Sequence, residues 1–164
     1  MKVLYALEGG VAGAAALTLL HESLKRAIPN APRIDLLGMN AIANGIRAVG
    51  AKTPSDRKLY TMALGGDLIS NTVFYSFAGI GKREYALLKG AGLGLLAGIG
   101  AVLLPRPLGL KESTTNRSTE TKLITVGLYV AGGLLAAGVM KFLDRKQKKS
   151  HAEWEHRLLT SSMA

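Results

Sequence analysis

Long apolar runs separated by short charged connectors dominate the sequence. Four runs are long enough for a bilayer, whose hydrocarbon core of about 30 Å requires about 20 helical residues. They cover residues 3–20, 60–80, 86–104 and 123–143. The third has no polar side chain from Gly90 to Leu104, so it lacks the polar face of a surface helix in a soluble bundle. The pattern predicts an all-α fold, a four-span transmembrane helix bundle.

Two further segments carry a different pattern. Residues 34–50 alternate apolar and polar side chains at roughly helical spacing and end at Gly50, which predicts an amphipathic helix in the membrane interface. A re-entrant or core-packed helix is the alternative. Residues 144–164 are rich in charge and form a basic tail, either a short helix on the membrane surface or a disordered segment.

Composition supports a membrane bundle. Apolar residues make up 48% of the 164 residues although the net charge is +10, and the mean hydropathy is +0.22. Basic connectors of a membrane protein are expected to meet anionic lipid headgroups, so nucleic acid is not predicted as a partner. Cysteine is absent, which excludes disulfides, thiolate metal sites and thiol catalysis.

Small residues recur at four-residue intervals in three of the runs. They are Gly9 and Gly13, then Gly90, Gly94 and Gly98, and finally Gly133 and Ala137. Such spacing lets helix backbones approach closely in lipid and predicts tight helix packing. Residues 92–97 also match the dinucleotide pattern G-x-G-x-x-G/A, but no strand precedes them, so that interpretation is rejected.

Two carboxylates interrupt the apolar runs. Glu8 lies in the first run and Asp67 in the second, with Asn71 one turn beyond Asp67. Charge inside a span is costly, so Glu8, Asp67 and Asn71 form the candidate ion or proton site. The structural alternative is that Glu8 reaches the headgroups and that Asp67 and Asn71 bridge neighbouring helices.

Metal and enzyme chemistry are not predicted. His21 and Glu22, together with Glu8 or Asp67, have the side chains of a metal site, but the paired Glu-x-x-His repeats of di-iron bundles are missing. The histidines, including His151 and His156, are interpreted as solvated interface residues. No phosphate loop, nucleophile elbow or HExxH motif occurs, and we predict no cofactor.

The orientation of the spans is weakly encoded. The 21 Lys and Arg residues divide almost evenly between the two sides of a four-span bundle, whereas the positive-inside rule requires an asymmetry. The dense basic cluster at residues 145–149 favours a cytoplasmic C-terminus.

One resemblance adds to this interpretation. The stretch from Gly9 to Gly13, followed by Thr18 and then by residues 32–38, resembles uncharacterised small bacterial multi-pass inner-membrane proteins. In those proteins a G-x-x-A-G first span leads through a proline-containing connector to a short Asp-Leu-rich helix. The resemblance covers about the first 40 residues and implies a bundle in the bacterial inner membrane, without an activity.

Two functions fit these features. The first is a non-enzymatic accessory or structural subunit of a membrane complex, whose partners are other membrane subunits or copies of itself. The second is a small proton- or cation-coupled transporter or channel that uses Glu8 or Asp67. A membrane enzyme acting on lipid through His21 and Glu22 is a distant third possibility.

Overall fold

The computed structural model describes the backbone of residues 3–161 and the side chains of residues 3–147. Helices account for every regular element in that part of the chain. The long ones are α1 (Val3–Ala27), α2 (Ile34–Ala48), α3 (Asp56–Ser76), α4 (Ala86–Leu103) and α5 (Thr119–Ser161). Three short 3₁₀ turns lie between them: η1 (Phe77–Gly79), η2 (Arg83–Tyr85) and η3 (Glu112–Thr114). The predicted all-α class is confirmed.

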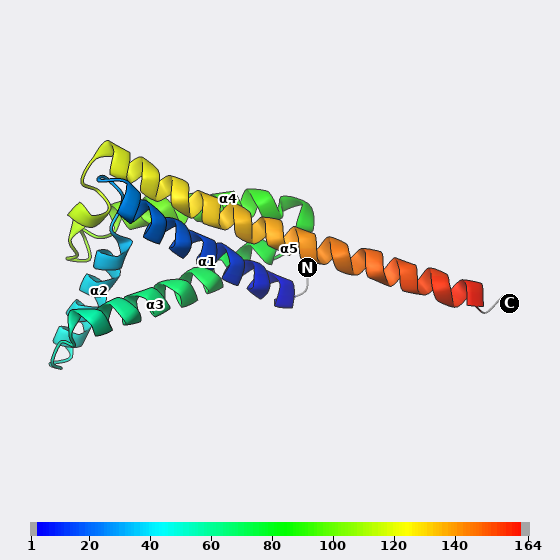
Figure 1. Ribbon diagram of the computed structural model, residues 1–164, viewed down its shortest axis with the longest axis horizontal. Helices are drawn as coiled ribbons and strands as arrows, with labels where there is room; N and C mark the ends of the chain where they lie inside the picture. Colours follow the sequence, from blue (N-terminus) through cyan, green and yellow to red (C-terminus); the bar gives the residue numbers. More distant parts are fainter. Residues whose placement is uncertain (1–2, 162–164) are drawn as a thin grey trace.

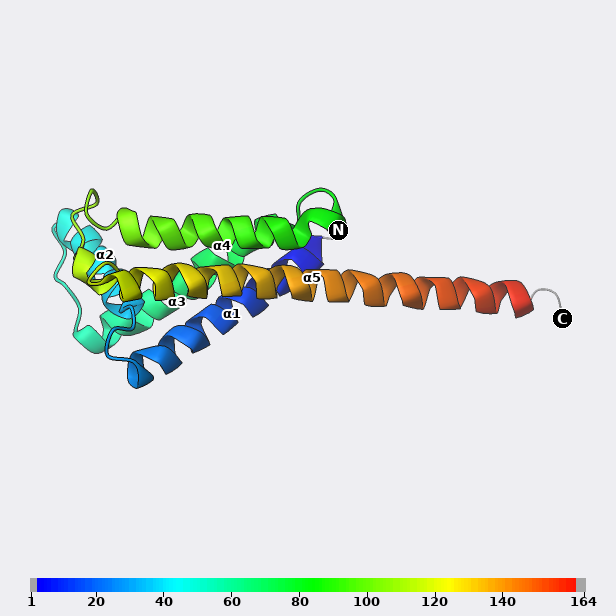
Figure 2. The same ribbon diagram turned by 90° about the horizontal axis from the view of Figure 1, so that it is seen from above.

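Four of the helices run back and forth along one axis, and α2 lies across one end (Figure 1). Helices α1 and α4 run in one direction, and α3 and α5 run in the other. Helix α5 lies between α1 and α4 (Figure 2), with α1 packed on α3 and α2 packed on α3. The close neighbours of α5 are therefore α1 and α4, while α3 joins the bundle through α1.

Within the described part of the chain, three helices are long and apolar enough to cross a membrane. They comprise Val3–Ala27, Arg83–Leu103 and Thr119–Gln147. Helix α3 falls short of that composition because it begins with the charged residues Asp56, Arg57 and Lys58 and carries Asp67 and Asn71 in its middle. The chain thus has the helices of a membrane protein, and the fourth span stays a prediction.

Several boundaries differ from the predicted ones. Helix α1 continues to Ala27 instead of ending at residue 20, because the polar residues that follow the apolar run are good helix formers. Helix α2 ends at Ala48, and Gly50 adopts a positive φ of 74° at the turn beyond it, a conformation that glycine adopts without strain. Helix α5 passes through residue 144 without a break.

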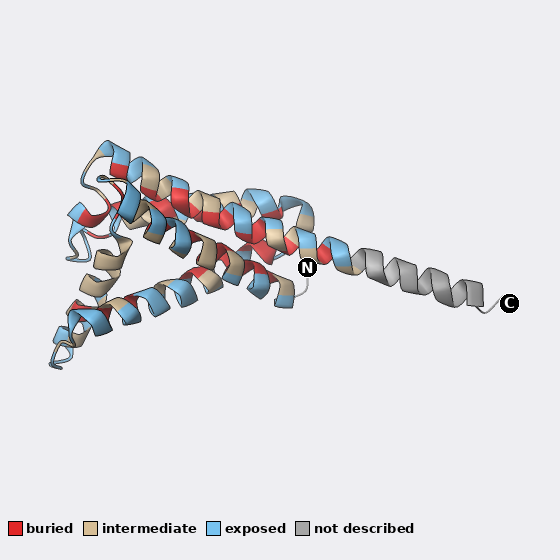
Figure 3. Cartoon of the chain, viewed as in Figure 1, coloured by how far each residue is buried: buried red, intermediate tan, exposed pale blue. Residues whose placement is uncertain are grey.

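Small side chains form much of the core. The buried cluster combines Leu17, Tyr75, Leu128, Tyr129 and Met140 with Ala78, Ala86, Ala136 and Ala137. Buried positions recur along α5 (Figure 3), and Gly133 and Ala137 are those that face Gly90 of α4. Small residues bring the helix backbones close together, and this increases van der Waals contact where lipid removes the hydrophobic drive between helices.

The predicted small residues lie at two helix interfaces. A Cβ atom built on Gly94 or Gly98 of α4 would lie 2.6 or 2.7 Å from the Cα atom of Val130 or Val126, and Gly90 faces Gly133 and Ala137. On the other side of α5, a Cβ on Gly9 or Gly13 of α1 would lie 2.6 Å from a backbone oxygen of α5. Helix α5 is therefore held between two glycine faces.

Candidate functional site around Asp67

Two hollows of the bundle meet at Asp67. The first is a cavity of about 340 Å³ between α1, α2 and α3, with Tyr129 of α5 on its wall. The second is a groove of about 660 Å³ between α3 and α4. Both are mostly apolar, and both are lined by Leu37, Asp67, Ser70, Leu110 and Tyr129. Asp67 therefore stands on the wall that separates a cavity in the bundle from a groove at its side.

Asp67 and Asn71 bond to each other within α3. The Nδ2 atom of Asn71 donates to the Asp67 carboxylate at 2.9 Å and to the Asp67 backbone carbonyl at 3.0 Å. These bonds join one turn of α3 and do not bridge two helices, unlike the structural alternative expected from the sequence. Among the residues described, Asp67 forms no ion pair. A proton or a bound cation would remove the cost of its charge.

His21 and Thr18 bring two unpartnered polar atoms to the cavity wall. His21 is only 7% exposed, and its ring lies edge-on to Tyr129 with the centroids 5.8 Å apart. Within the described part of the chain, His21 Nε2 and Thr18 Oγ1 are buried without a hydrogen-bond partner. The prediction of a solvated His21 is wrong, because α1 continues past residue 20 and carries the ring between α2 and α5. The side chains of His151 and His156 lie outside the described residues.

Glu8 does not belong to this site. Its side chain is exposed, and no hydrogen bond or ion pair reaches it from the side chains described. Gly10, two residues further along α1, packs against Thr72 and Ser76 near the end of α3, whereas Asp67 shares its cavity with Thr18. The two carboxylates therefore lie at different levels of the bundle, and Asp67 lines the cavity and the groove described above, whereas Glu8 lines neither.

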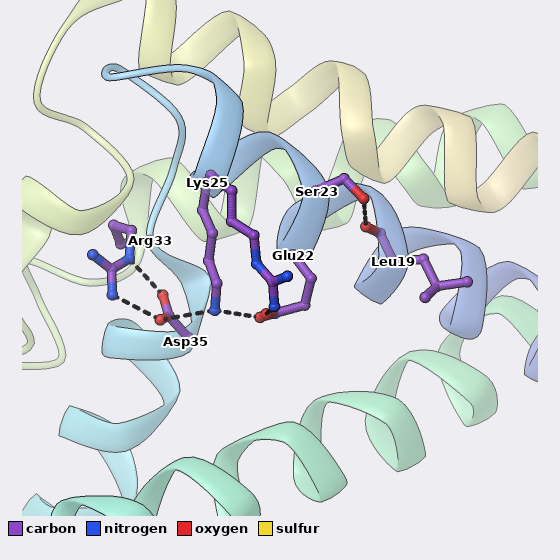
Figure 4. Close-up of polar contacts among 7 residues, drawn as sticks. Leu19, Glu22, Ser23, Lys25, Arg33 and Asp35 are labelled. Carbon is purple, nitrogen blue, oxygen red and sulfur yellow. Dashed lines mark hydrogen bonds and ion pairs between the residues drawn. The ribbon is translucent and has the colours of Figure 1, made fainter.

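The carboxylates near His21 bind cations of the protein itself. Arg33 donates from Nε and Nη2 to the two oxygens of Asp35 at 3.0 and 2.9 Å, and Lys25 approaches Asp35 at 3.4 Å and also contacts Glu22 (Figure 4). Lys25 also lies 5.0 Å from the ring centroid of Tyr60. This charge cluster joins the end of α1 to the first turns of α2 and α3. No group of three possible metal ligands occurs among the residues that the structure describes.

The charge cluster perturbs Asp35. Partial burial raises the pKa of the Asp35 carboxyl, but the hydrogen bonds and positive charge of Arg33, with smaller help from Leu36 and Lys25, outweigh burial and hold the pKa below its usual value. The same partnership raises the pKa of Arg33. Sequence reasoning missed this cluster, although the Arg33-x-Asp35 spacing beside Glu22 and Lys25 was its visible signal.

Comparisons of the chain with protein-family models, with curated proteins and with solved structures found no match. The resemblance to small bacterial membrane proteins therefore stays a prediction.

Proposed function

We propose that the chain is a non-enzymatic integral membrane protein that crosses the bilayer four times and serves as a subunit of a larger membrane complex. In this proposal α5 is its docking arm. The bacterial inner membrane, with a cytoplasmic C-terminus, is the proposed location.

The direction of the helices supports four crossings. Tyr5, at the start of α1, donates to Gln147 of α5 at 2.8 Å, and Arg83, just before α4, pairs with Asp144 of α5 at 2.9 Å. Helices α1 and α4 therefore begin at the same end of the bundle. Both are candidate spans, so the chain must return across the membrane between them. Helix α3 is the long helix that makes this return, with its backbone groups satisfied internally as lipid requires.

The observation that carries the subunit proposal is the length of α5. Its described contacts with the rest of the bundle extend as far as Gln147, yet the helix continues unbroken to Ser161 and projects past the ends of α1, α3 and α4 (Figure 2). The 14-residue extension spans about 20 Å at 1.5 Å per residue. A helix held at its base by two glycine interfaces presents this extension in a fixed direction, which suits a docking role.

Truncation tests the proposal. A stop codon after Gln147 removes the extension and leaves the described bundle contacts in place. The truncated protein should insert and elute as a single species in mild detergent, and it should lose the stoichiometric membrane partners that copurify with the full chain. The docking role of α5 is refuted if both forms purify with the same partners, and the subunit proposal is refuted if both purify as homo-oligomers alone.

A second candidate function is cation- or proton-coupled transport through Asp67. The observation that favours it is the position of this carboxylate between the cavity and the groove, without a cationic partner among the described residues. Asp67→Asn keeps the size and much of the hydrogen bonding of the side chain. It should abolish cation flux into proteoliposomes while the protein still folds, whereas Glu8→Gln, at an exposed site, should preserve the flux. Wild-type flux in Asp67→Asn would exclude a transport role for Asp67.

A further inference from the structure

At the opposite end of the bundle from the charge cluster, η2 meets α5. Arg83 of η2 pairs with Asp144 of α5 at 2.9 Å, and its Nη2 atom also donates to the backbone carbonyl of Lys141 at 3.1 Å. Both side chains are largely shielded from solvent. This double contact ties the connector between α3 and α4 to α5 and fixes the shape of the surface around it.

An open depression of about 670 Å³ adjoins the Arg83–Asp144 pair. It is lined by Lys82, Arg83, Glu84, Lys141 and Arg145, so with Asp144 beneath it four cations face two carboxylates. Lys82, Lys141 and Arg145 form no ion pair with any side chain that the structure describes. The depression therefore has an excess of positive charge, and the Arg83–Asp144 ion pair fixes its shape.

Exposed apolar side chains lie within four residues of the lining residues along the chain. Ile80, Leu88 and Phe142 are 61%, 72% and 64% exposed. Leu88 and Phe142 belong to candidate spans, so their exposed faces meet hydrocarbon when these helices lie in a bilayer. The first backbone amides of α4 also point toward this end and add partial positive charge. The depression thus lies where the lipid-facing surface ends, at the level of the headgroups.

We propose that this depression binds the phosphate of an anionic phospholipid. The phosphate is held by Lys82, Lys141 and Arg145, and the acyl chains lie along the exposed apolar surface near Leu88 and Phe142. A free phosphate ion has the same negative charge but no acyl chains to contact the apolar side chains. A zwitterionic lipid has the phosphate and the acyl chains but no net negative charge. The site goes beyond the subunit proposal and does not depend on the docking arm.

Lipid binding to the full-length protein in mild detergent tests this site. The probes are phosphatidylglycerol, phosphatidylcholine and inorganic phosphate, measured by native mass spectrometry and by the shift of the melting temperature. Lys82→Gln/Arg145→Gln removes two cations and leaves the Arg83–Asp144 pair intact. Arg106→Gln/Lys111→Gln makes the same charge change at exposed positions of the other end and is the control.

Phosphatidylglycerol should bind and stabilise the wild-type protein more than phosphatidylcholine does. The Lys82/Arg145 variant should bind it about thirtyfold more weakly, as expected for two lost basic groups near a lipid surface, and the control variant should change little. The proposal is overturned by an equal loss in the control, by equal binding of the two lipids, or by inorganic phosphate that stabilises the protein as well as the anionic lipid does.

Discussion

Replacing Gly94 by leucine tests the packing of α4 on α5 most directly. A Cβ atom at this position would lie 2.6 Å from the Cα atom of Val130 and 2.9 Å from the carbonyl carbon of Tyr129. Carbon atoms in favourable contact are about 3.5–4.0 Å apart, so the Cβ alone requires the helices to separate by about 1 Å. The atoms in its way belong to the backbone of α5 and cannot rotate aside.

The expected cost follows from this geometry. Overpacking of a close-packed interior costs about 1–3 kcal/mol, occasionally more, and Gly94→Leu belongs at the upper end because it opens the interface along its length. Gly90 and Gly98, one turn away on either side, would lose contact with α5 as well. We expect a clear fall in melting temperature and an earlier loss of the monodisperse peak on heating in detergent, measured by fluorescence-detected size exclusion.

Gly92→Leu is the matched control. Gly92 lies two residues away on the same helix, it is exposed, and a Cβ there would meet no described atom within 4 Å. Both variants raise the hydropathy of α4 equally and replace glycine by the same better helix former. Gly92→Leu should therefore leave the melting temperature unchanged or raise it slightly. Equal melting temperatures for the two variants would refute the packing argument.

Three other predictions address topology, the charge cluster and the core. Reporter fusions after Gly50 and Ser113 should lie on one side of the membrane. Fusions after Lys82 and Glu155 should lie on the other side, and any other pattern contradicts the four crossings. Because the folded pKa of Asp35 is depressed by Arg33, this pair stabilises the protein above the unfolded pKa and ceases to do so as pH falls through the folded pKa. Asp35→Asn should then lower the free energy of unfolding at pH 7 by about 1 kcal/mol, reduced by the exposure of Arg33, and should flatten the acid limb of the stability profile; an unchanged acid limb contradicts this. Tyr75→Phe removes a buried hydroxyl that donates to the Tyr129 carbonyl at 2.9 Å and should cost about 1 kcal/mol in thermal or denaturant unfolding, whereas Tyr85→Phe, at an exposed ring, should cost almost nothing.

Much of the fold was predictable because it depends on local properties of the chain. Long apolar runs determine where helices of spanning length form, and α4, at Ala86–Leu103, lies within one residue of the predicted boundary. Four-residue spacing of glycine likewise places Gly90, Gly94 and Gly98 on one face of a helix before any partner is known. Helix ends were less predictable, since polar residues such as Glu22 and Lys25 extend a helix as readily as they end an apolar run.

The tertiary structure decided which of these residues meet. In the sequence, Glu8 and Asp67 are both carboxylates in apolar runs. The packing of α2 and α4 beside α3 places Asp67 on the wall of two hollows and leaves Glu8 exposed. The burial of His21 also depends on distant residues, because its neighbour Tyr129 lies more than 100 positions away. Helix periodicity specifies a face of each helix, whereas the partner of that face depends on how the connectors direct the helices in space. For this reason the elements follow from the sequence, and the candidate site follows from their assembly.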